Sequence, residues 1–154
     1  LRRDAIASYT TALELDEQYT SAWAGKGFSQ NELAALLAQT GQTDAAIALR
    51  RDAIESYTRA LTINPDYRGA NYNRGLIYKS LEQWQPMYDD FNTVVEAEPE
   101  NYGAYLNRGI AASRLGRTQE AAEDLRKARA LAQERGASGY VEQAETELAR
   151  LGVD

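Results

Sequence analysis

The hydrophobic residues of the chain recur at intervals of three and four, which is the spacing of amphipathic helices. In the segment 118–133, for example, Ala121, Leu125 and Ala128 fall on one helical face, and the residues between them are mostly charged. No segment shows the two-residue alternation of a strand, so we expect an all-α fold. The periodicity predicts helices at 1–14, 20–39, 43–62, 68–81, 84–97, 102–115, 118–133 and 138–151.

Turn-forming residues separate the predicted helices. Gly116 and Gly136 are expected to end helices in the left-handed conformation, and Pro65 follows a helix that it cannot continue. The candidate N-caps, whose side-chain oxygens accept hydrogen bonds from free backbone N–H groups, are Thr43 and Thr118.

Two internal repeats with different offsets run through the chain. Pro65 and several neighbouring residues recur 34 positions later, whereas residues 1–13 match residues 49–61 at 11 of 13 places, with an offset of 48. The longer offset adds about two helical turns to each of two antiparallel helices. We therefore expect the hairpin 20–63 to extend about 10 Å beyond its neighbours.

Each repeat contains part of one order of residue types: a large residue, then small and aromatic residues along a first helix, then Ala, an aromatic residue and Ala along a second helix, then Pro. The residues of this pattern are Ala5, Tyr9 and Ala12; then Trp23, Gly27, Ala53, Tyr57, Ala60 and Pro65; then Gly75, Tyr78, Trp84, Phe91 and Pro99; and finally Tyr105, Gly109, Leu115, Gly116, Ala121, Leu125 and Ala128. The first copy departs from it, because Glu17 stands where Pro would fall.

This pattern resembles the tetratricopeptide repeat family over nearly the whole chain. The resemblance implies a right-handed superhelical solenoid of antiparallel helix pairs, with about three full repeats, an N-terminal half-repeat and a C-terminal capping helix. We expect a single domain, 1–154, made of a half-repeat 1–17, an extended repeat 20–65, repeats 68–99 and 102–133, and a capping helix 138–151.

Small residues explain how such hairpins would pack. Gly27, Gly75 and Gly109 would let the paired helix approach where a side chain would collide. The capping helix would bury Ala144 and Leu148, with Glu147 on its solvated face.

Composition narrows the possible functions. The formal net charge is −6, which disfavours nucleic-acid binding, and the chain has no Cys and no His. Disulfides, the usual zinc sites and imidazole acid–base catalysis are therefore excluded, and we expect neither an enzyme nor a cofactor or metal site. The apolar runs are too short for a membrane span. We expect the chain to be a fragment of a longer protein, because Leu1 lies inside a predicted helix. We expect a cytoplasmic location, although a targeting segment can lie upstream of Leu1.

The resemblance also implies that the first helix of each pair lines a concave face that binds a peptide or a helix of a partner protein. Asn73 and Asn107 sit where many family members place an Asn that bonds the main chain of the ligand, whereas Gly25 stands at the matching place in the first repeat. The candidate groove residues are Phe28, Asn31, Tyr72, Asn73, Leu76, Lys79, Leu106, Asn107, Ile110 and Arg114.

Two alternatives concern charged ligands. Lys26, Arg74 and Arg108 form a basic column with two possible roles. In the first, their hydrocarbon stems pack on the protein while their charged heads reach water. In the second, the column binds an acidic ligand together with Lys79 and Arg114. The carboxylate clamp for chaperone tails is disfavoured. The residues at its positions are Ala24, Phe28, Asn73, Gly103 and Asn107, of which only Asn73 fits.

We therefore expect a protein–protein interaction scaffold that binds a segment of a partner in its concave groove. The alternative is a structural spacer, or a self-association module that forms a homo-oligomer through the hairpin 20–63.

Overall fold

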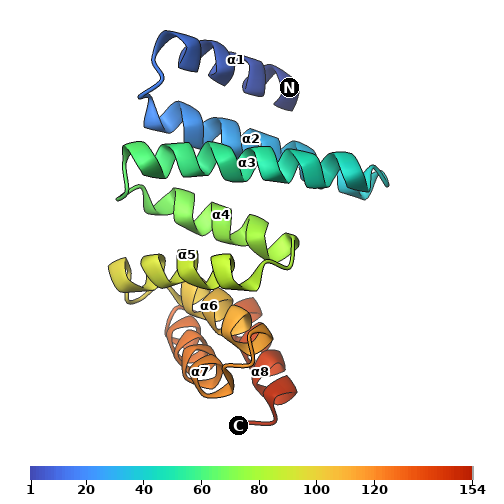
Figure 1. Ribbon diagram of the computed structural model, residues 1–154. Helices are drawn as coiled ribbons and strands as arrows, with labels where there is room; N and C mark the ends of the chain where they lie inside the picture. Colours follow the sequence, from blue (N-terminus) through green and yellow to red (C-terminus); the bar gives the residue numbers. More distant parts are fainter. Residues whose placement is uncertain (154) are drawn as a thin grey trace. The chain divides into compact units, whose positions relative to one another are not determined.

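The computed structural model describes residues 1–153, and all the regular structure in this range is helical (Figure 1). The predicted all-α class is confirmed, and every predicted helix is present with its ends within one residue of the expected position. The helices are α1 (Arg2–Leu15), α2 (Thr20–Gln39), α3 (Thr43–Ile63), α4 (Arg68–Ser80), α5 (Trp84–Ala97), α6 (Tyr102–Arg114), α7 (Thr118–Glu134) and α8 (Ser138–Leu151).

The chain forms two compact units. The N-terminal unit is Leu1–Ile77, and the C-terminal unit is Tyr78–Asp154, of which Tyr78–Val153 is described. The boundary falls inside α4. A single domain over the whole chain stays a prediction.

In the N-terminal unit, α2 packs along α3 as a long antiparallel hairpin, and α1 packs on α2 (Figure 1). α2 has 20 residues and α3 has 21, compared with 13 in α4 and 14 in α5. The predicted lengthening of this hairpin is confirmed. Its two helices meet near the tip at Ala34 and Ala46, which are both fully buried, while Leu36 is 40% exposed.

In the C-terminal unit, α6 packs against α5, α7 and α8, and α7 packs against α8. The core contains Met87, Phe91 and Leu125, none of which is exposed. At Gly109, a Cβ atom would lie 3.0 Å from Cγ of Leu125 and 3.2 Å from the carbonyl oxygen of Ala121. The predicted close approach of α6 to α7 at this glycine is therefore confirmed.

The helix ends agree only partly with the sequence. Gly116 and Gly136 have the expected left-handed backbone, with φ of 76° and 68°. Glu82, which lies 34 positions before Gly116, has a positive φ of 55° without being a glycine. The predicted caps are wrong: Thr43 and Thr118 are the first residues inside α3 and α7, and the residues at the cap positions make no side-chain capping bond.

Candidate functional site

A pocket of about 300 Å³ opens in the C-terminal unit beside α6 and α8, and we call it the α6/α8 pocket. It brings together three of the predicted groove residues: Lys79, Ile110 and Arg114. The remaining lining residues are Trp84 from the start of α5 and Glu142, Gln143, Thr146 and Glu147 from α8. None of the residues from α8 was expected to contribute to a site.

Lys79 is held in place by a buried amide. Its Nζ donates to Oδ1 of Asn107 at 2.9 Å, and Nδ2 of Asn107 donates to the carbonyl oxygen of Gly103 at 2.8 Å. Burial lowers the pKa of Lys79; the Glu147 carboxylate opposes this shift and the Arg114 guanidinium adds to it. Asn107 thus positions the cation of the pocket.

Arg114 and Glu147 form an ion pair in the lining of the pocket. Nη1 of Arg114 lies 3.5 Å from Oε2 of Glu147, and the guanidinium carbon lies 5.9 Å from the centre of the Trp84 ring. The Glu147 side chain is only 13% exposed and also accepts from Arg150 at 3.1 Å. The expectation that Glu147 lies on a solvated face is therefore wrong, because α8 packs on α6 as well as on α7.

Several predicted groove residues serve the packing of the C-terminal unit. Leu106, Asn107 and Ile110 are 1%, 4% and 6% exposed, respectively. Only Ile110 of these three lines the α6/α8 pocket. A direct contact of Leu106 and Asn107 with a ligand stays a prediction, and their burial leaves little surface for it.

The predicted groove residues of the N-terminal unit are more accessible. Phe28 is 54% exposed and Leu76 is 37% exposed, while Asn31, Tyr72 and Asn73 are half-buried. Their role in binding also stays a prediction.

The glycine that interrupts the series of asparagines has a structural explanation. A Cβ atom on Gly25 would overlap Cζ of Tyr9, whose ring rests against α2. An Asn at position 25 would therefore collide with α1.

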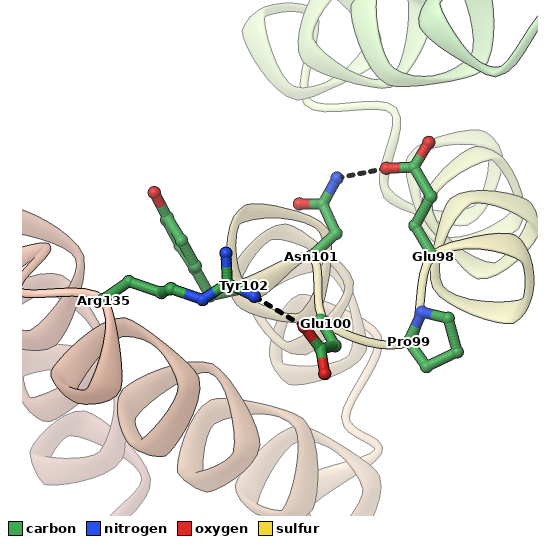
Figure 2. Close-up of a pocket in the computed structure, with 6 residues that line it drawn as sticks. All are labelled: Glu98, Pro99, Glu100, Asn101, Tyr102 and Arg135. Atoms are coloured by element: carbon green, nitrogen blue, oxygen red, sulfur yellow. Dashed lines mark hydrogen bonds and ion pairs between the residues drawn. The ribbon is translucent and has the colours of Figure 1, made fainter.

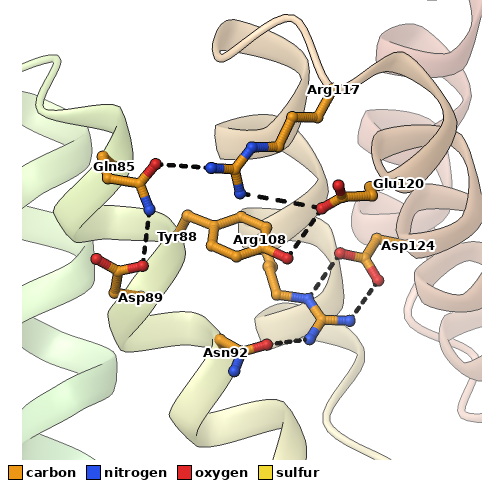
Figure 3. A network of polar contacts seen from close by, with 8 residues as sticks. All are labelled: Gln85, Tyr88, Asp89, Asn92, Arg108, Arg117, Glu120 and Asp124. Atoms are coloured by element: carbon orange, nitrogen blue, oxygen red, sulfur yellow. Dashed lines mark hydrogen bonds and ion pairs between the residues drawn. The ribbon is translucent and has the colours of Figure 1, made fainter.

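Arg108 forms an internal polar network with side chains of α5 and α7 (Figure 3). Its Nε and Nη2 donate to the two carboxylate oxygens of Asp124 at 2.7 Å each, and Nη1 donates to Oδ1 of Asn92 at 2.6 Å. Beside it, the Tyr88 hydroxyl donates to Glu120 at 3.0 Å. The hydrogen bonds to Asp124 raise the pKa of Arg108, although burial opposes the shift.

This network changes the interpretation of the basic column. The Arg108 side chain is only 17% exposed, and its guanidinium bonds to Asp124 and Asn92 within the protein. An internal ion pair was neither of the two alternatives. Arg74 makes a corresponding bond in the N-terminal unit, where its Nη1 donates to Oγ1 of Thr58 at 2.8 Å. Thr58 precedes Asn92 by 34 residues, as Arg74 precedes Arg108. This shared offset was the sequence signal for a structural role.

A second open pocket lies where the turn between α5 and α6 meets the end of α7 (Figure 2). Its polar groups bond to one another: Arg135 forms an ion pair with Glu100, and Nδ2 of Asn101 donates to Glu98 at 2.8 Å. Asn101 also caps α6, since its side chain accepts from the N–H of Ala104 at 3.0 Å. We assign these contacts to the stability of the turn.

Two other kinds of site were sought in residues 1–153. No helix there is both long enough and apolar enough to cross a lipid bilayer. Nor does this range contain a group of three or more Asp and Glu residues arranged to hold a metal ion.

Known proteins with a similar sequence or structure were found for this fold. A family model described as tetratricopeptide repeat matches residues 89–138. No match to the chain was found among curated protein sequences. Among solved structures, the chain is similar to YrrB, a tetratricopeptide repeat protein with an unusual peptide-binding site: the identity is 20%, the TM-score is 0.72, and the match covers 97% of this chain and 69% of that one.

Two further structures match most of both chains. The Arabidopsis OM64 tetratricopeptide repeat domain is 25% identical with a TM-score of 0.59, and the match covers 81% of this chain and 93% of that one. The second tetratricopeptide repeat domain of human RPAP3, in complex with the HSP70 peptide SGPTIEEVD, is 21% identical with a TM-score of 0.63. The match covers 88% of this chain and 99% of that one. The family's sequence pattern is thus matched in residues 89–138, and the fold of the chain is similar to that of these tetratricopeptide repeat structures.

Proposed function

We propose that this protein is an interaction scaffold, and that its C-terminal unit binds a segment of a partner protein in the α6/α8 pocket. The observation that carries the proposal is the convergence of Lys79, Ile110 and Arg114 with Trp84 around one cavity. Clefts that combine an apolar wall with a few positioned polar groups are the usual form of a binding site.

The lining of the pocket suits one anchoring side chain of a longer segment. Trp84 and Ile110 supply apolar contact, while Lys79 and Arg114 supply cationic donors for carbonyl or carboxylate oxygens. Glu142 and Glu147 in the same lining supply carboxylate acceptors for backbone N–H groups. A volume of about 300 Å³ is at the lower end for a small-molecule site, so most of a bound segment would lie on the surface around the pocket.

The N-terminal unit offers a second contact surface of its own. Phe28 and Leu76 expose apolar area, and Asn73 carries an amide that can both donate and accept. The proposal is supported by the fold, because the similar RPAP3 domain was solved with a bound peptide. The carboxylate clamp stays disfavoured, since most of its positions are not matched.

The test compares two variants with the same loss of charge. Lys79→Gln with Arg114→Gln removes the cations of the pocket, and Arg68→Gln with Lys127→Gln removes two cations from exposed positions elsewhere. Each protein is used to capture partners from an extract of the native cells, and the affinity of each captured partner is then measured by titration calorimetry. We expect at least a tenfold loss of affinity for the pocket variant alone. Equal affinities for the two variants, with unchanged helical content, would rule out the pocket as the binding site.

Self-association through the hairpin 20–63 is a second candidate, favoured by one observation. Leu36 is 40% exposed on the lengthened part of α2. If this surface joins two copies, Leu36→Glu will weaken the dimer in sedimentation velocity measurements over a range of concentrations. A parent protein that is monomeric at every concentration eliminates this candidate.

A further inference from the structure

We propose that a pocket in the N-terminal unit binds an arginine side chain of a partner protein. This pocket, which we call the turn pocket, has a volume of about 290 Å³ and lies between the turn that joins α1 to α2 and the C-terminal half of α3. Its lining includes Trp23 of α2 and the acidic residues Glu17 and Glu55. The site is separate from the α6/α8 pocket, and the inference does not depend on the proposed function.

The Trp23 indole is an apolar wall of the turn pocket and is held against the turn. Its Nε1 donates to the carbonyl oxygen of Glu17 at 2.9 Å. The ring already accepts one cation, because Nζ of Lys26 lies 5.3 Å from its centre. Lys26 is not among the lining residues, so the pocket adjoins a part of the ring that Lys26 leaves open. A guanidinium can stack there, because it is planar, delocalised and weakly hydrated.

Negative charge converges on the turn pocket from both the backbone and the side chains. α1 ends directly before the turn, and α3 ends at Ile63, which lines the pocket (Figure 1). The C-terminal end of a helix carries a partial negative charge, and neither helix has a basic residue in its last turn. The side chains of Glu17 and Glu55 are exposed and form no ion pair within residues 1–153. Two carboxylates and two helix ends thus favour a cationic ligand.

Other lining residues suit the main chain beside that arginine. Arg59 and Thr62 can donate to carbonyl oxygens of the bound segment. Because Arg59 repels a second guanidinium, we expect the charged group of the ligand to lie between Trp23 and the two carboxylates. A volume of about 290 Å³ is just below the usual range for a small-molecule site, so the pocket holds one side chain and the rest of the segment lies outside it.

The internal repeat of the chain singles out the residues of this pocket. α3 repeats the first 13 residues of the chain with 11 identities, and the two residues that differ, Glu55 and Arg59, both line the turn pocket. Their counterparts in α1 are the small, uncharged Ala7 and Thr11. Exposure alone does not explain this, because three other exposed positions of the repeat are unchanged in α3: Arg51, Asp52 and Thr58. Glu17 is a third departure, since both later repeats have proline at its place.

The probe for a test is arginine blocked at both ends, as its Nα-acetyl methylamide. The matched control is the citrulline analogue, in which a neutral urea group replaces the guanidinium. Nuclear magnetic resonance follows the indole N–H signals of the two tryptophans, and Trp84→Phe identifies which signal belongs to Trp23. We expect the arginine probe to shift the Trp23 signal along a saturating curve with a Kd on the order of 1 mM, and the citrulline analogue to bind at least tenfold more weakly. No saturating shift of the Trp23 signal, or equal binding of the two probes, would overturn the proposal.

Two variants with the same loss of charge locate the binding. Glu17→Gln with Glu55→Gln removes the carboxylates of the turn pocket. Asp44→Asn with Asp52→Asn removes two carboxylates of α3 that do not line it. All four side chains are exposed, so both variants should fold. We expect the pocket variant to bind the arginine probe at least tenfold more weakly than the parent protein, and the control variant to stay within about twofold of it. Equal affinities of the two variants would show a general attraction to the acidic surface and would contradict the proposal.

Discussion

The guanidinium of Arg108 donates to both carboxylate oxygens of Asp124, and the two side chains are only 17% and 9% exposed. Paired geometry of this kind is favourable as long as both charges are present, whereas a single partner left in the interior is strongly unfavourable.

Removing one member of this pair should destabilise the protein. We expect Arg108→Met and Asp124→Leu each to lower the free energy of unfolding by about 3 kcal/mol, because each leaves a desolvated charge without its partner. The double variant should lose less than the sum of the two, since it leaves no unpaired charge. Urea denaturation of the four proteins measures the coupling. Strict additivity would show that the pair contributes nothing as a pair.

The left-handed backbone at Glu82 predicts a stabilising substitution. Non-glycine residues in this region cost about 1–2 kcal/mol, so Glu82→Gly should raise the free energy of unfolding by up to about 1 kcal/mol after the greater chain entropy of Gly is subtracted. The converse change at the repeat-related position, Gly116→Glu, should lower it by about 1 kcal/mol. No other atom lies within 4 Å of a Cβ added there, so only the backbone conformation is affected. Thermal denaturation shows whether each substitution raises or lowers the stability as expected.

The contact between Tyr9 and Gly25 predicts a local steric limit. Gly25→Ala should cost about 1 kcal/mol, because the new methyl group would overlap the end of the Tyr9 ring and the ring would have to turn away. Gly69→Ala is the control: nothing lies within 4 Å of a Cβ at Gly69 in the first turn of α4, so this change should be neutral or slightly stabilising. Chemical denaturation compares the two, and similar effects would refute the close approach.

Tyr57 predicts a loss of stability in alkali. Burial raises the pKa of Tyr57 above its ordinary value of 10.0, so the unfolded chain ionises this hydroxyl first. The stabilisation is complete below pH 10 and is lost as the pH rises above it. Above pH 10, the free energy of unfolding of Tyr57→Phe should therefore fall less steeply than that of the parent protein, by about 1 kcal/mol per pH unit. Urea denaturation at pH 9, 10 and 11 measures the difference.

Tyr19 supplies the control for the alkaline measurement. Its side chain is 51% exposed, and Tyr19→Phe should reproduce the pH dependence of the parent protein. If Tyr57→Phe behaves in the same way as Tyr19→Phe, burial of the Tyr57 hydroxyl has no effect on stability.

The sequence predicted what depends on periodicity. The helices, the left-handed glycines and the close approach at Gly109 all follow from residue types that recur at fixed offsets. It did not predict what depends on which side chains meet. Arg108 looked like a surface cation because its partner, Asp124, belongs to another helix, and Glu147 looked solvated because the packing of α8 on α6 was unknown.

The sequence likewise predicted some residues of the candidate site and missed others. Lys79, Ile110 and Arg114 were expected to share one surface, and they do line one pocket. Trp84 had been identified only as a repeat-packing residue. Its place in the pocket follows from the turn between α4 and α5, whose left-handed residue, Glu82, carries no glycine signal.

The seven residues by which α2 exceeds α4, and α3 exceeds α5, have a consequence for how such hairpins vary. Seven residues make almost two whole turns and shift the phase of a helix by only about 20°. The packed stripe at the base of each helix therefore keeps its orientation when a heptad is added to both arms. A hairpin can thus be lengthened in increments of about 10 Å while its neighbours stay unchanged, whereas an insertion of two or five residues would rotate the contact face away from them.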